Sequence, residues 1–200
     1  VGHTLLLDAA YHLYADEPHG WAETITEALN NGMLWPENLL ITIAVSLSKS
    51  HTIYGLRTGA LVSLHPDSAV TERIGAVMGV TGRQTWSAAP RIAQYTVSTM
   101  HADEQSGAAW AEERDRLRDL LVTRRNALNE ACSKLGVPLN PTMDGFFAWI
   151  ESDDPAALAE ACADQDVYLV PLTGGVRIGL CAVPLSQIPR VAEALANALA

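Results

Sequence analysis

The segment that most constrains the fold of this chain is a largely apolar run at residues 39–45, Leu-Leu-Ile-Thr-Ile-Ala-Val. A short continuous run rich in β-branched residues is typical of a strand covered on both faces. It is much shorter than the ~20 apolar residues of a membrane-spanning helix. Similar runs at residues 4–7 and 59–64 accompany helical patterns at 21–30 and 65–80. Strands that alternate with helices predict an α/β layer.

The rest of the chain has a different pattern. Two helical segments follow at residues 88–100 and 108–135, and the second is long enough to connect two domains. Beyond it, short strands mix with helices, with strands expected at 145–150, 166–170 and 176–180 and helices at 155–164 and 184–199. We therefore predict an α/β part at 1–105, an interdomain helix at 106–136 and a small α+β domain at 137–200.

Composition excludes several classes of function. Hydrophobic residues make up 48% of the 200 residues and charged residues 18%, as expected of a globular chain. A formal net charge of −10 disfavours nucleic acid and anionic membranes as partners. The histidines and cysteines show no metal-ligand spacing, so we expect no metal site. The three cysteines, an odd number without a CxxC pair, indicate reduced thiols and a cytoplasmic location.

The chain opens without Met, directly in the strand-like run at residues 4–7. We therefore expect it to be the C-terminal part of a longer protein.

The residues that follow the run at 39–45 have reactive side chains in a compact pattern. Ser46, Ser48 and Lys49 come just after the predicted strand, and Arg57 lies eight residues beyond the lysine, between Gly55 and Gly59. An amine at the end of a buried strand can hold an aldehyde cofactor as a Schiff base. A hydroxyl and an arginine can together hold a phosphate. Both glycines allow close backbone approach.

Two further groups stand out. Asp8 ends the first predicted strand, where ligands of open α/β sheets bind, and Tyr11 follows. Asp8 could instead cap the next turn while Tyr11 packs. Arg177 lies inside an apolar strand pattern and needs an anionic partner, either a substrate carboxylate or a structural salt bridge.

Taken together, these motifs resemble the C-terminal half of class I and II aminotransferases, which are fold-type-I pyridoxal-phosphate enzymes. The resemblance covers essentially the whole chain and lies in Asp8-x-x-Tyr11, in Ser46-x-Ser48-Lys49 with Arg57, and in Gly175-Val176-Arg177-Ile178. It implies part of a pyridoxal-phosphate-transferase large domain, with a mixed, mostly parallel sheet and helices. A long connecting helix and a small C-terminal α+β domain would follow.

The resemblance also implies residue roles. Lys49 would form the Schiff base with pyridoxal 5′-phosphate, and Asp8 would pair with its ring nitrogen. Tyr11 would bond its 3-oxygen, while Ser46 and Arg57 would hold its phosphate.

Substrate-binding residues are implied in the same way. Arg177 would bind the substrate α-carboxylate. The segment Gly-Arg-Gln-Thr-Trp-Ser-Ala-Ala-Pro at 82–90 resembles one that reaches the neighbouring subunit's site in aspartate and aromatic aminotransferases. There Arg83 would meet a distal carboxylate and Ser87 the phosphate, which implies a homodimer with sites at its interface. Trp86 replaces the family's Tyr, and Arg83 could also be a surface charge.

The predicted function is therefore transamination between an aromatic or dicarboxylic L-amino acid and a 2-oxo acid such as 2-oxoglutarate. Two alternatives remain: another fold-type-I enzyme, such as a β-lyase or decarboxylase, and the aminotransferase-like domain of a transcription regulator. The family normally has roughly as much chain again before the position of Asp8. We therefore expect these 200 residues alone to be inactive and to bind the cofactor weakly or not at all.

Overall fold

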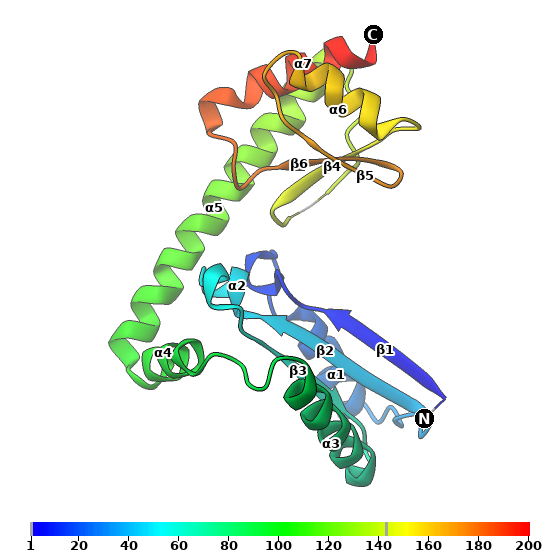
Figure 1. The fold of residues 1–200 in the computed structure, drawn as a ribbon, viewed down its shortest axis with the longest axis vertical. Coiled ribbons are helices and arrows are strands. Elements are labelled where there is room, and N and C mark those ends of the chain that lie inside the picture. The colour runs from blue at the N-terminus through cyan, green and yellow to red at the C-terminus, as the bar shows by residue number, and fades with distance from the viewer. Residues whose placement is uncertain (1, 143) are drawn as a thin grey trace. The chain divides into compact units, whose positions relative to one another are not determined.

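A computed structural model describes residues 2–142 and 144–200. The chain forms two compact units (Figure 1), and each is described by itself below. Unit 1 contains residues up to 13 and 17–114, and unit 2 contains 14–16 and 115–200. The predicted division at 105 and 136 stays a prediction. No helix in the described ranges is long and apolar enough to span a membrane.

Unit 1 is built on a mixed three-stranded sheet. Strands β1 (His3–Asp8) and β2 (Leu39–Ser46) pair in parallel, and β3 (Gly59–Leu64) pairs antiparallel with β2. The helical elements of this unit are η1 (His12–Tyr14, whose last residue belongs to unit 2), α1 (Gly20–Asn30), α2 (Leu47–Ser50), η2 (Tyr54–Leu56), α3 (Ser68–Thr85), α4 (Arg91–Ala102) and the start of α5 (Glu104–Leu135).

Burial in unit 1 is uneven. Ile41 and Ile43 of β2 form a small core with Ala9, as the continuous apolar run predicts. Residues 4–7 form a strand as expected, but the expected burial is wrong, because Leu5 and Leu6 are 46% and 62% exposed. Strand β1 pairs only with β2 within the described ranges and so lies at the edge of the sheet. Its successive side chains point to opposite faces, and both faces are open at Leu5 and Leu6.

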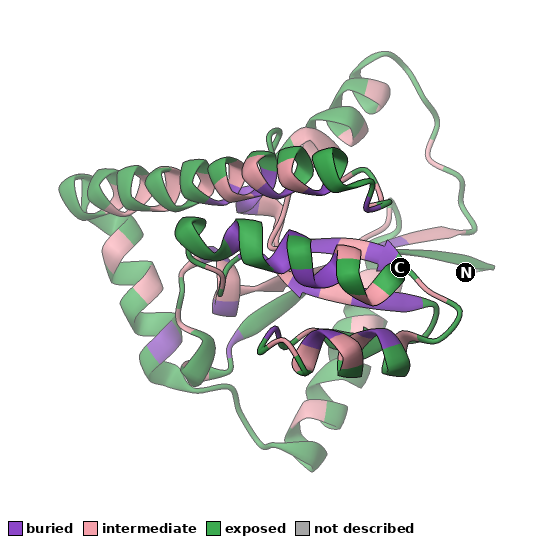
Figure 2. Cartoon of the chain, turned by 90° about the horizontal axis from the view of Figure 1, so that it is seen from above, coloured by how far each residue is buried: buried purple, intermediate pink, exposed green. Residues whose placement is uncertain are grey.

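Unit 2 is an α+β layer with a larger core. Its antiparallel sheet has the order β4-β6-β5. The elements are the remainder of α5, β4 (Phe147–Glu151), α6 (Pro155–Ala163), β5 (Val170–Leu172), β6 (Gly175–Gly179), η3 (Leu185–Gln187) and α7 (Ile188–Leu199). Figure 2 shows buried residues on the strands and on one side of the covering helices, where Leu128, Ile150, Ile178 and Leu195 are completely buried.

Most predicted elements are present, with shifted ends. Helix α5 begins four residues earlier than expected, and α3 continues to Thr85 instead of ending near residue 80. The strand expected at 166–170 is wrong: Asp166 has a φ of 56°, and pairing begins only at Val170. The α/β part, the long helix and the small α+β part of the predicted fold are all confirmed.

Candidate functional site

The turn after β2 presents Lys49 to two aromatic rings. Ser46 caps α2, because its Oγ accepts a hydrogen bond from the Ser48 N–H at 3.3 Å. The Lys49 Nζ then lies 5.5 Å from the Tyr11 ring centre and 5.3 Å from that of Tyr54. Aromatic faces attract a cation without neutralising its charge. The amine is therefore held at the strand end while it remains chemically available.

Arg57 shares one of these rings. Its Cζ lies 4.6 Å from the Tyr54 ring centre, and its Nη1 donates to the Tyr54 carbonyl oxygen at 2.9 Å. The same Nη1 lies 3.5 Å from the Ser48 Oγ, so the guanidinium and a hydroxyl face one region. Arg57 has a φ of 49°, in the left-handed region that non-glycine residues avoid. Such strain often occurs at functional positions.

Asp8 lies at the carboxyl end of β1, in register with Ala44 of β2. Its Oδ1 accepts from the Ala10 N–H at 3.1 Å, so it does cap the next turn, and it is also exposed. Within residues 2–142 and 144–200, Asp8, Lys49 and Arg57 take part in no salt bridge. None of these three side chains is therefore paired with an opposite charge of a described residue.

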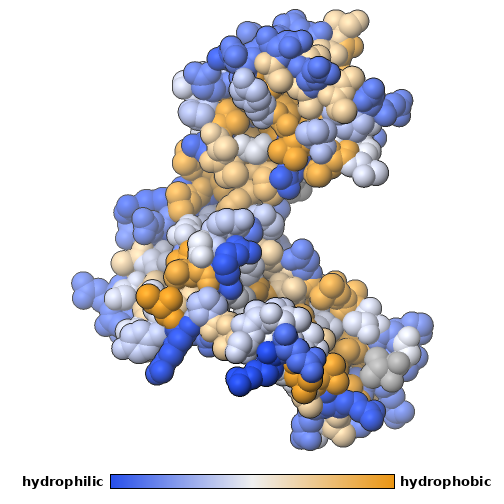
Figure 3. Space-filling model, viewed as in Figure 1, coloured by the Kyte–Doolittle hydropathy of each residue, from blue (hydrophilic) through white to orange (hydrophobic). Residues whose placement is uncertain are grey.

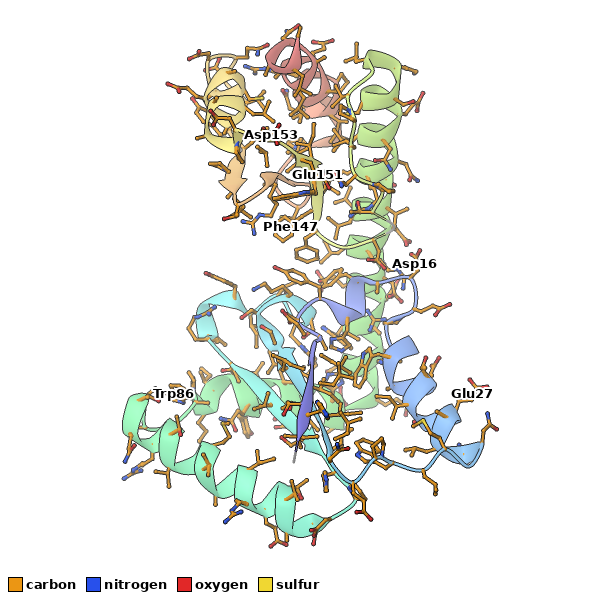
Figure 4. The ribbon with its side chains drawn as sticks, turned by 90° about the vertical axis from the view of Figure 1, so that its right-hand side faces the viewer. Asp16, Glu27, Trp86, Phe147, Glu151 and Asp153 are labelled. Atoms are coloured by element: carbon orange, nitrogen blue, oxygen red, sulfur yellow. The ribbon has the colours of Figure 1, made fainter. Side chains whose placement is uncertain are left out.

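Arg83 and Ser87 lie at the far end of α3, beside Trp86, which Figure 4 labels where the helix ends. Ser87 has a φ of 72°, and its N–H donates to the Gly82 carbonyl at 2.9 Å. All three side chains are exposed, and no contact found in the described part of the chain joins them to the Lys49 group. Figure 3 shows further apolar side chains at the surface over α3, which buries no residue.

Arg177 belongs to unit 2, in β6, where it pairs with Trp149 of β4 and Val170 of β5. Its Cζ lies 4.3 Å from the centre of the Phe147 ring, which Figure 4 labels. It also lines a cavity of about 330 Å³ within this unit, together with Tyr168. It takes part in no salt bridge with a described residue, so the structural ion pair left open by the sequence is not seen.

Sequence reasoning missed one contributor to the site and left the choice of hydroxyl open. It assigned no role to Tyr54, which contacts both Lys49 and Arg57. Ser48, not Ser46, is the hydroxyl nearest Arg57. Spacing along the sequence identifies the group of residues, but which hydroxyl faces the guanidinium depends on how the turn is capped.

The arrangement suits a small anionic aldehyde. It combines a primary amine, a guanidinium with a neighbouring hydroxyl, and a carboxylate at an adjacent strand end. Within the described ranges, no group of three or more His, Cys, Asp or Glu residues could hold a metal ion.

Comparisons with known proteins all identify aminotransferases as similar to this chain. The family model "Aminotransferase class I and II" matches residues 2–195. An aromatic-amino-acid aminotransferase of Paracoccus denitrificans is 32% identical over 123 residues, covering 62% of this chain and 30% of that protein. The crystal structure of an aminotransferase from Anaerococcus prevotii has a TM-score of 0.87 at 27% identity, covering 96% of this chain and 46% of that one.

A second crystal structure is also similar to this chain. It is an aromatic-amino-acid aminotransferase from Burkholderia pseudomallei covalently bound to pyridoxal phosphate, with a TM-score of 0.75 and 25% identity over 98% of this chain and 48% of that one. The chain thus spans less than half the length of each of these three relatives. Because the family model matches nearly every residue, the chain belongs to the family of class I and II aminotransferases.

Proposed function

We propose that this chain acts in pyridoxal-phosphate-dependent transamination between an L-amino acid, aromatic or dicarboxylic, and a 2-oxo acid such as 2-oxoglutarate. The observation that supports this most is the position of the Lys49 amine between the Tyr11 and Tyr54 rings, with Arg57 on the same Tyr54 ring. The names of the similar proteins support the same activity.

The residues present fit this cofactor. Pyridoxal phosphate has an aldehyde, a phosphate dianion, a ring nitrogen and a phenolic oxygen. Lys49 would take the aldehyde, Arg57 with Ser46 or Ser48 the phosphate, Asp8 the ring nitrogen and Tyr11 the phenolic oxygen. When bound, the cofactor supplies an electron sink for the bond electrons at the substrate α-carbon.

The chain's own residues would then position charges and move a proton. The Asp8 carboxylate favours a protonated ring nitrogen, because opposite charges stabilise each other. The Lys49 Nζ would be the base that takes the substrate's α-proton. Arg177 would hold the α-carboxylate, its guanidinium oriented by the Phe147 ring.

We also propose that the site is shared within a homodimer, in which Arg83 and Ser87 serve the neighbouring subunit. Their exposure at the end of α3 is compatible with that role. The cysteines Cys132, Cys162 and Cys181 are all free thiols, which supports a reducing compartment such as the cytoplasm.

A labelling experiment tests whether Lys49 is the residue that binds the cofactor aldehyde. The chain has only two lysines, Lys49 and Lys134, and Lys134 is exposed and pairs with Glu130 at 2.6 Å. We expect borohydride reduction with pyridoxal phosphate to label the full-length protein at Lys49, as read by peptide mass spectrometry. Lys49→Ala should abolish the label, and the matched Lys134→Ala should retain it. Equal labelling of both lysines would contradict the assignment.

A donor panel tests the reaction. The full-length protein with 2-oxoglutarate should transfer amino groups from aromatic or dicarboxylic donors. Arg83→Ala should weaken the use of aspartate and glutamate selectively. If both are used equally well without Arg83, its role in dicarboxylate binding is wrong.

A further inference from the structure

A histidine beside Lys49 is held by three contacts that the reaction does not require. His51 ends α2 and belongs to unit 1. Its Nδ1 lies 2.8 Å from the Ser50 Oγ, and its Nε2 lies 2.9 Å from the Nε2 of His101 in α4. Its ring stacks on Trp110 of α5, with centres 4.6 Å apart and planes 11° from parallel. The turn that contains Lys49 is thereby tied to two helices.

The donors and acceptors in these hydrogen bonds show which atoms of Ser50, His51 and His101 carry the protons. The Ser50 hydroxyl gives its single proton to the Ser46 carbonyl at 2.9 Å. The Ser50 oxygen must therefore accept from His51 Nδ1–H. This leaves His51 Nε2 as an acceptor, which His101 Nε2–H fills. If both rings become cations, two N–H groups oppose each other and the contact is lost.

The surroundings of His51 favour its neutral form. Burial, and then the basic groups that face it, lower the pKa of His51 from 6.5 to about 4. Those groups are His101 from α4, His12 from η1 and Arg114 from α5. A positive charge on His51 would be repelled by each of them.

We propose that the hydrogen-bonded pair of His51 and His101 positions Lys49, holding its turn against α4 and α5, and that protonation of both rings releases the turn. The connection to Lys49 is short. Ser50 links the His51 ring to the carbonyl of Ser46, and Ser46 caps the helix that contains the lysine. The consequence for the cofactor rests on the proposed function, but the linkage itself does not.

The pH dependence has a definite direction. In the unfolded chain His51 takes up a proton near pH 6.5, and in the folded chain only near pH 4. As the pH falls through this interval, protonation favours the unfolded state, so the stability contributed by neutral His51 is lost. Below about pH 4 both states are protonated and the loss levels off.

Histidine-selective NMR of the full-length protein without cofactor tests the linkage. We expect the His51 ring to be the Nδ1–H tautomer at pH 7 and to titrate near pH 4. His51→Phe assigns its signal and keeps a ring on Trp110. Titration near 6.5 with the opposite tautomer would overturn the proposal.

Two variants of His101 distinguish a role in positioning Lys49 from a role in packing alone. His101→Ala should raise the pH at which His51 titrates and should shift the acid limit of Lys49 labelling by pyridoxal phosphate to another pH. His101→Gln can still donate an N–H to His51 and should restore the tautomer, and because its amide does not become a cation, acid should no longer release the turn. An unchanged labelling profile in both variants would overturn the positioning role. If Lys49 is never labelled while His51 titrates as expected, the proposed function fails and the linkage stands.

Discussion

Gly59 is placed where the backbones of β2 and β3 come closest. A Cβ at this position would lie 2.4 Å from the Val45 carbonyl oxygen, too close for any real contact. Gly55 was also expected to allow close backbone approach, but nothing lies within 4 Å of a Cβ added there. Only the second glycine of the motif is therefore required by packing.

We predict that Gly59→Ala lowers the free energy of unfolding by about 1–3 kcal/mol, as overpacking does in other proteins. The matched Gly55→Ala should change it by about 0.5 kcal/mol or less, because the site is open. Urea denaturation of the two variants measures the difference. Equal effects would contradict the close approach.

The cysteines differ in reactivity for a physical reason. Burial raises the pKa of the Cys132 thiol to about 11 and also raises that of Cys162, whereas Cys181 is exposed. Because the thiolate is the nucleophile, we predict that one thiol per chain reacts rapidly with a disulfide reagent at pH 8 in the native protein. Cys181→Ser should abolish that fast phase. Three equally fast thiols would show that the core of unit 2 is open.

Helix α5 is anchored by one buried arginine. Arg125 is 3% exposed and donates to the carbonyl oxygens of Gly145 and Phe147, at 2.6 and 3.4 Å. Burial lowers the pKa of its guanidinium, and the carboxylates of Asp144 and Asp16 act in the opposite direction. The arginine thereby fixes the start of β4, including the ring that supports Arg177.

We predict that Arg125→Met destabilises the protein by about 3 kcal/mol, since buried carbonyl groups lose a charged donor. Arg118, on the same helix, forms longer pairs with Asp115 and Asp119 at 3.6 and 3.8 Å. Arg118→Met should cost no more than about 1 kcal/mol, as is usual for surface pairs. Thermal unfolding monitored by circular dichroism compares the two, and similar costs would contradict the anchoring role.

The elements themselves were predictable where the signal is local. The apolar run at 39–45 and the helical pattern at 65–80 gave the right element types. In the structure Asp67 caps that helix, because its Oδ1 accepts from the Ala69 N–H at 2.9 Å. The strand expected at 166–170 failed because pairing, not propensity, defines a strand. The partner β6 meets the chain only from Val170 onward, after the left-handed Asp166.

At the scale of the whole molecule, the two units differ in how much apolar surface they bury. Unit 2 contains most of the completely buried side chains, whereas α3 of unit 1 buries none and β1 leaves two leucines exposed. Local opening requires less free energy where few apolar contacts are lost.

Hydrogen exchange of the chain should therefore be slowest in β4, β6 and α7 and fastest in α3 and β1. Mass spectrometry of peptides from each element measures this order. Protection of α3 equal to that of β6 would indicate that a surface exposed here is covered in solution.

The sequence by itself determined the family, the strands and helices with clear periodicity, and the set of charged side chains after β2, because these depend on residues close together in the chain. Only the tertiary structure decided which side chains meet. The stacking of Lys49 and Arg57 on Tyr54 depends on the fold of the turn. The contact between His51 and His101 joins residues 50 positions apart. Such contacts arise when α4 and α5 pack beside α2, and no local pattern encodes that packing.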